Sequence, residues 1–181
     1  MQCRLCDYGV IQCIHSNIVL FKIKEINMGI AVMLHVLAVA IWVGGMFFAY
    51  MALRPVAAIQ LEPPARLSLW VGVFGKFFPW VWVCVIAILG TGFWMIAILG
   101  GFKVIGLYVH VMLILGIVMM LIFMHVYFAA YKRLKLAVAA QDWPTGGGKL
   151  AQIRMLIGIN TILGLLTIAV GSGGRYFIFF H

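Results

Sequence analysis

Acidic residues are scarce in this sequence, and charge of either sign is low. Asp and Glu number four among 181 residues, and charged residues together make up 9%. A soluble domain carries about 25% charged residues. Hydrophobic residues make up 66% of the chain, so polar groups cannot cover its surface and lipid must be its solvent. The length allows one domain.

The few charges exclude several classes of protein. No Asp or Glu falls inside an apolar stretch, which argues against a proton pump or cation antiporter built on buried carboxylates. The net charge of +9 does not indicate a nucleic-acid partner, because the Lys and Arg residues form short clusters between apolar runs. That distribution is typical of the positive-inside rule. Cys84 lies within an apolar run, so the four cysteines do not form a disulfide framework.

Four apolar stretches are long enough to cross a bilayer, which takes about 20 residues. They span residues 28–53, 77–99, 104–131 and 150–172. A single strand in lipid would leave its backbone groups unpaired, so these stretches are expected to be helices. The predicted fold is all-α, an antiparallel four-helix transmembrane bundle over residues 28–176, followed by a short tail, 177–181.

The connecting loops predict an orientation. The segments 54–76 and 132–154 carry most of the basic residues, whereas Lys103 and Arg175 are alone in theirs. By the positive-inside rule the two basic loops face the cytoplasm, and both termini lie outside. The prediction is a multi-pass protein of a bacterial inner membrane. Six aromatic residues lie near predicted helix ends, where they suit an aromatic belt: Trp80, Trp82, Trp94, Tyr108, Tyr127 and Tyr131.

Residues 1–27 differ from the rest of the chain. They mix Cys, Lys, Asp and Glu without periodicity, and the uninterrupted apolar run begins at Met28. Our hypothesis is that the working protein starts at Met28 and that 1–27 form an N-terminal extension absent from the mature protein. Cys3, Cys6, Cys13 and His15 have a spacing that could suit a metal, but a two-residue gap is weak support, and this site requires the extension.

Polar residues inside a membrane are candidates for function. His35 and His110 each lie about seven residues into a predicted helix, and the two helices run in the same direction. The sequence therefore predicts both imidazoles at one depth in the outer leaflet, where they could share a metal ion or the iron of haem b. The alternative is two separate histidines, each bonded to a backbone carbonyl or a hydroxyl. Gly90, Thr91 and Gly92 are expected to line the same region.

Two further residues are candidate metal ligands. His125 lies about 22 Å along its helix from His110, so it cannot join the outer site. A hydrogen-bonded structural role is one reading of His125, and a second metal or haem site is the other. Met112 is one of several methionines on the third helix. Thioethers bind Cu(I), but methionine also fills gaps in apolar cores.

Two runs resemble known families. LHVLAVAIWVGGMFFAYMALRP, residues 34–55, resembles the first helix of copper resistance protein D (CopD) and its relatives, which carry a His followed by a Trp-x-Gly-Gly or similar. YVHVMLILGIVMMLIFMHVYFAAYKRL, residues 108–134, is similar to the third helix of the related HemJ-type protoporphyrinogen oxidases. The resemblance implies an inner-membrane protein of copper handling, or of haem b in the HemJ branch, with His35 and His110 at the family's histidines.

The chain departs from both families. HemJ-type proteins typically carry a Lys two residues after the third-helix His, where this chain has Met112, and this puts porphyrinogen oxidation in doubt. CopD itself has about eight spans, so the chain would match only its C-terminal part.

Three functions follow from the sequence. The first is a haem b or metal centre between His35 and His110, serving electron transfer or copper and metal homeostasis with a membrane or periplasmic partner. The second is copper transport through His and Met sites that include Met112 and His125. The third is a structural or assembly subunit without a cofactor. No residue is identified as catalytic, and whether the protein is an enzyme stays open.

Overall fold

The computed structural model describes the backbone from Arg4 to Tyr176 and the side chains of residues 15–174 and of Tyr176. The described backbone is helical throughout, apart from short connections, and contains no strand. Its elements are α1 (Arg4–Phe48), a π-helical turn η1 (Ala49–Leu53), α2 (Arg54–Gln60), α3 (Pro63–Leu99), α4 (Leu107–His125), a π-helical turn η2 (Val126–Tyr131), α5 (Lys132–Ala139), α6 (Trp143–Gly173) and a 3₁₀ turn η3 (Gly174–Tyr176).

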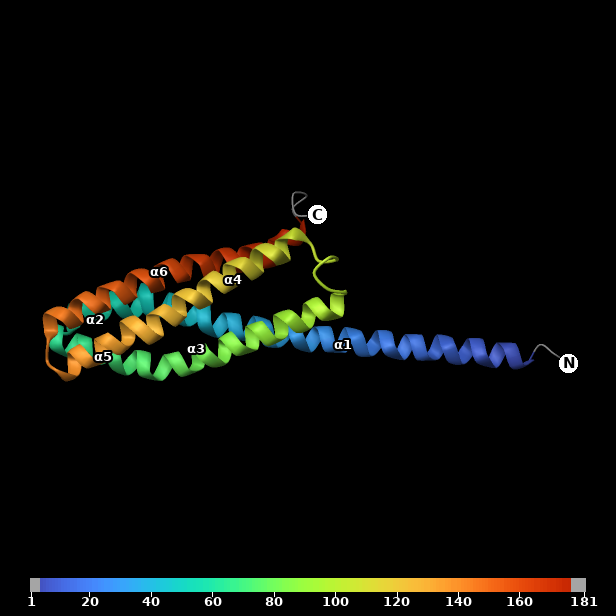
Figure 1. Cartoon of the computed structure of the whole chain (residues 1–181), viewed down its shortest axis with the longest axis horizontal. Helices are drawn as coiled ribbons and strands as arrows, with labels where there is room; N and C mark the ends of the chain where they lie inside the picture. Colours follow the sequence, from blue (N-terminus) through green and yellow to red (C-terminus); the bar gives the residue numbers. More distant parts are fainter. Residues whose placement is uncertain (1–3, 177–181) are drawn as a thin grey trace.

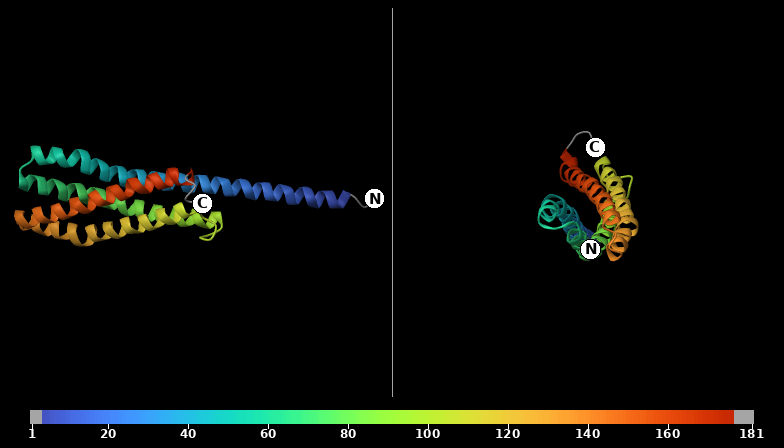
Figure 2. Two further views of the ribbon diagram at one scale, coloured as in Figure 1. Left: turned by 90° about the horizontal axis from the view of Figure 1, so that it is seen from above. Right: turned by 90° about the vertical axis from the view of Figure 1, so that its left-hand side faces the viewer.

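Four segments of the described chain are long and apolar enough to cross a membrane: His15–Gln60, Pro63–Leu99, Leu107–Ala139 and Trp143–Gly173. Figure 1 shows the chain passing back and forth between two ends of one bundle. Its closest pairs are α1 with α3 and α4 with α6, and Figure 2 shows these pairs side by side. The prediction of an all-α four-helix transmembrane bundle is confirmed.

The helices are longer than the predicted stretches, and the first and third continue past residues 53 and 131. Pro55 lies in the first turn of α2, where a missing N–H leaves no hydrogen bond unmade. The turn before it widens to the π-helix Ala49–Leu53, so the chain stays helical to Gln60. In the same way, η2 carries the third span past Lys132 to Ala139.

Two ends of the bundle are distinguished by their residues. We call the half that holds α2, α5 and the turns at 61–62 and 140–142 the arginine half. The half that holds His35, His110 and the connection at 100–106 is the histidine half. The N-terminal part of α1 projects beyond the histidine half (Figure 1). Helix α1 runs through Met28 without a break, and the absence of residues 1–27 from the mature protein stays a prediction.

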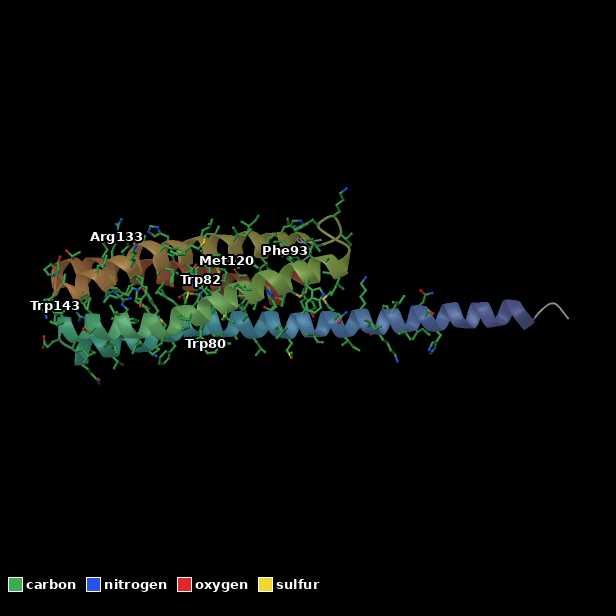
Figure 3. The ribbon with its side chains drawn as sticks, turned by 60° about the horizontal axis from the view of Figure 1, so that its bottom comes forward. Trp80, Trp82, Phe93, Met120, Arg133 and Trp143 are labelled. Atoms are coloured by element: carbon green, nitrogen blue, oxygen red, sulfur yellow. The ribbon has the colours of Figure 1, made fainter. Side chains whose placement is uncertain are left out.

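Aromatic rings fill the arginine half. Phe74 and Phe78 on α3 stack with ring centroids 5.0 Å apart, and Phe78 meets Tyr131 of η2 edge-to-face at 5.0 Å. Phe123 of α4 joins them 5.6 Å from Phe78. In Figure 3, Trp82 and Met120 lie along the bundle between Trp143 at one end and Phe93 toward the other.

The aromatic belt stays a prediction, and three of its residues, Trp82, Tyr127 and Tyr131, contact one another. Their helices extend well beyond the predicted ends, and the rings pack on one another, with Tyr131 buried and the other two half-buried. The Tyr131 hydroxyl is buried and donates to the carbonyl of Val71 on α3 at 3.2 Å. This bond ties η2 to α3 in the arginine half.

Candidate functional site

His35 lies on α1 against α3. Its Nδ1 is 2.9 Å from Oγ1 of Thr91, and a Cβ on Gly92 would lie 3.6 Å from its Cε1. The prediction that this part of α3 lines the His35 region is confirmed. Because Gly92 has no side chain, α3 approaches the imidazole closely.

The Thr91 hydroxyl determines the tautomer of His35. Oγ1 lies 2.6 Å from the carbonyl of Ala87, which can only accept, so the single hydroxyl hydrogen is donated there. Oγ1 must then accept from His35, and Nδ1 carries the proton. We therefore assign His35 as the Nδ1–H tautomer, which leaves the lone pair of Nε2 free. A metal-binding histidine typically has this arrangement, with its other ring nitrogen held by an oxygen.

His110 has the same tautomer for a different reason. Its Nδ1 is 3.3 Å from the backbone carbonyl of Gly106, an obligate acceptor, so Nδ1 donates and the Nε2 lone pair is free. The ring lies 6.3 Å, centroid to centroid, from Phe102 in the loop between α3 and α4. His110 is half-buried.

The two histidines lie less alike in depth than predicted. Helix α4 begins at Leu107, so His110 is in its first turn, about 4.5 Å of rise from the helix start. His35 is level with Thr91, about 12 Å of rise before the end of α3. Neither a hydrogen bond nor a ring contact joins the two imidazoles in the described part of the chain. His35 is bonded to a hydroxyl and His110 to a backbone carbonyl. These are the partners expected if the two histidines act separately and share no metal.

His125 is in a different position. It is exposed at the end of α4, with Nε2 3.5 Å from Nε2 of Gln152 on α6. An amide nitrogen can only donate, so the Nε2 lone pair of His125 is engaged. This contact matches a hydrogen-bonded structural histidine.

Thioethers from two helices meet one face of α6. The Met46 sulfur of α1 accepts from Asn160 Nδ2 at 3.7 Å. The Met119 sulfur of α4 lies 3.9 Å from Oγ1 of Thr167, whose hydroxyl donates to the carbonyl of Leu163 at 2.8 Å. Met112 of α4 lies against Gly171, where a Cβ would be 3.2 Å from its sulfur.

These α6 positions follow one another at helical spacing. Asn160, Thr167 and Gly171 recur at intervals of seven and four residues, so they share a face. From Asn160 to Gly171 the helix rises about 16 Å. The three sulfur atoms therefore form a row from the histidine half toward the middle of the bundle. Sequence spacing on α4 alone could not show this row, because Met46 comes from α1.

Asn160 is buried with an unpaired oxygen. Its side chain is 3% exposed, and Oδ1 has no hydrogen-bond partner among the described residues. It lines a small cavity of about 20 Å³ together with Met46, Trp42 and Phe78. That volume holds about one water molecule. Asn160 is the polar group at the inner end of the sulfur row.

The described residues contain no cluster of the side chains that most often bind metals. No group of three or more His, Cys, Asp or Glu side chains gathers among the described residues. Cys3, Cys6 and Cys13 lie outside the residues whose side chains are described. The soft donors that the described bundle offers are imidazole nitrogens, thioethers and the buried thiol of Cys84 on α3.

A family comparison decides what kind of protein carries these donors. The sequence profile of CopD, copper resistance protein D, matches residues 71–173, more than half of the chain. The chain belongs to the CopD family. The matched region contains His110, His125 and Met112, whereas His35 and Met46 precede it. No curated protein and no solved structure matched the chain significantly.

Proposed function

We propose that this CopD-family protein handles Cu(I) within the membrane, binding it at thioethers along α6 after entry at the histidine half. The observation that carries the proposal is that the sulfur atoms of Met46, Met119 and Met112 lie in a row along one face of α6. Thioethers are soft ligands that suit Cu(I). Met46 and Met119 are each 3% exposed, so lipid does not reach them.

The histidines support an entry step. His110 is nearest to the end of the bundle, and Met112 follows it by two residues. Both His35 and His110 have a free Nε2 lone pair. Copper binds the neutral imidazole, so protons compete with copper for these two rings. Under this proposal the basic loops face the cytoplasm of a bacterial cell, and copper enters from outside.

The test is Cu(I) affinity of the purified full-length protein, measured by competition with a chromogenic Cu(I) chelator. The variant Met46→Leu, Met119→Leu, Met112→Leu keeps the apolar volume of these side chains but removes their sulfur. We expect its affinity to fall at least tenfold. Met155→Leu is the matched control, because Met155 lies on the same helix but is 60% exposed. Equal affinity in the triple variant and the control would exclude the sulfur row.

A haem b centre is the second candidate, favoured by the free Nε2 atoms of His35 and His110. Two imidazoles are a known axial pair for haem iron, and haem would supply one-electron transfer. An absorption spectrum separates the two candidates. A Soret band that is lost in both His35→Ala and His110→Ala, and kept in His125→Ala, would support haem. Copper bound without a Soret band would support the first proposal.

A further inference from the structure

Three half-buried arginines from three helices converge in the arginine half: Arg54 of α2, Arg66 of α3 and Arg154 of α6. Tyr50 of η1 links the first to the third. The Arg54 guanidinium carbon lies 4.8 Å from the centroid of the Tyr50 ring. The same ring contacts α6, where a Cβ on Gly158 would lie 2.9 Å from Tyr50 Cε2.

The remaining contacts bring the other two arginines to the same place. Arg154 precedes Gly158 by four residues, so it shares the α6 face that meets Tyr50. Arg66 donates from Nη1 to the carbonyl of Ala58 at 3.4 Å, and Ala58 is one turn after Arg54 on α2. Arg154 interacts electrostatically with Arg54, Arg66 and Tyr50.

No carboxylate of the described chain neutralises this cluster. The two acidic residues of the arginine half are Glu62 and Asp142. Asp142 accepts from the backbone N–H of Thr145 at the start of α6, and Glu62 is exposed. The three arginines form no ion pair among the described residues. Like charges in partly buried positions are poorly screened by salt, so the cluster favours an anion from outside the chain.

The donor geometry selects the class of anion. Guanidinium groups are always charged and present paired N–H donors that match phosphate oxygens. Arg66 uses one donor on Ala58 and keeps the others, and no hydrogen bond of the described chain engages the guanidinium groups of Arg54 and Arg154. We propose that Arg54, Arg66 and Arg154 form a binding site for a phosphate group, carried by an anionic lipid or by a soluble phosphate.

The test uses the purified full-length protein in detergent, with two probes. Native mass spectrometry counts bound phosphatidylglycerol against phosphatidylcholine, and a second titration adds inorganic phosphate. We expect the protein to bind phosphatidylglycerol, inorganic phosphate or both more strongly than it binds phosphatidylcholine. Retention of the lipid alone assigns the lipid as the source. Binding of phosphate that displaces the lipid assigns one site open to both, and phosphate alone assigns a soluble ligand. Neither probe binding above phosphatidylcholine would overturn the proposal.

Single substitutions distinguish a specific binding site from nonspecific electrostatic attraction to the positive charge of the protein. Arg54→Gln, Arg66→Gln and Arg154→Gln should each weaken binding of the retained probe about tenfold, equivalent to one lost charged contact of about 1.4 kcal/mol. Arg133→Gln is the control, because it removes the same charge from an exposed position on α5. It should change binding less than twofold. An equal loss in Arg133→Gln would show a diffuse surface effect and contradict the site.

A charge-preserving variant tests the proposal even if the glutamine variants do not fold. Arg154→Lys keeps the charge but has no paired donors. We expect it to fold normally and to bind the probe several-fold more weakly. Wild-type affinity in Arg154→Lys, with a normal elution profile, would show that the guanidinium of Arg154 takes no part.

Discussion

The arginine half and the histidine half are built by the same four spans but packed in different ways. In the arginine half, rings of α3, α4 and η2 interlock, and the largest fully buried side chains include Phe74, Leu134 and Ile153. In the histidine half, no side chain of α4 before Met119 is buried, and small residues, hydroxyls and sulfur atoms occupy the contacts. Stability is therefore expected to come from the first half, and ligand chemistry from the second.

The largest expected effect tests where stability comes from. Phe78 is 3% exposed and Phe93 is 48% exposed, although both lie on α3. Phe78→Ala should lower the free energy of unfolding by about 3–5 kcal/mol, because it opens a cavity among the rings. Phe93→Ala should have a much smaller effect. Thermal unfolding in detergent measures both, and equal losses would contradict the division into two halves.

The next effect tests how closely α6 approaches α1 and α4. A Cβ on Gly164 would lie 2.8 Å from Val43 Cγ2 and 3.2 Å from Met119 Cε. Gly164→Ala should destabilise the protein by about 1–3 kcal/mol through overpacking. Gly116 has nothing within 4 Å of its Cβ position, so Gly116→Ala should be neutral or stabilising. Denaturant titration of the two variants compares them directly, and a neutral Gly164→Ala would mean that the helices separate easily.

A smaller effect is expected for the bond between η2 and α3. Tyr131→Phe removes the donor to the Val71 carbonyl and keeps the ring. We expect a loss of about 1 kcal/mol, the net value of one buried hydrogen bond, with Cu(I) affinity unchanged. Thr91→Val should alter metal binding as well as stability, because it removes the acceptor that orients His35 and leaves Nδ1–H without a partner. Loss of Cu(I) affinity in Tyr131→Phe would show that packing in the arginine half affects metal binding in the histidine half, and would contradict the division.

The smallest effect concerns pH at the edge of the arginine half. Hydrogen bonds from the Thr145 hydroxyl and amide lower the pKa of Asp142 below its ordinary value of 3.8. A lowered pKa adds stability that is fully present above that ordinary value and is lost as the pH falls through the folded-state pKa. We expect Asp142→Asn to reduce the loss of stability on acidification below about pH 4. An unchanged pH profile would show that this cap does not contribute.

The spans and the candidate histidines could be predicted because hydropathy and polarity are local properties. The helix ends could not, because Pro55 and Lys132 are typical stops, and only the neighbouring π-helical turns show that the chain continues through them. The His35 neighbourhood was predicted in part, since the Gly-Thr-Gly run on α3 was expected beside it. The arginine cluster was missed, although Arg54, Arg66 and Arg154 all belong to the basic segments 54–76 and 132–154.

By itself, the sequence determined the solvent of this protein, the number of its spans and the end of the bundle where positive charge collects. Each follows from composition along a single segment, because about 20 apolar residues without charge have no stable place but a bilayer. Tertiary structure decided which side chains meet. Helices that are apolar all round carry no stripe that sets their rotation. Contacts between helices therefore determine that Thr91 orients His35, that Met46 joins Met119 and Met112 on α6, and that three arginines share one site.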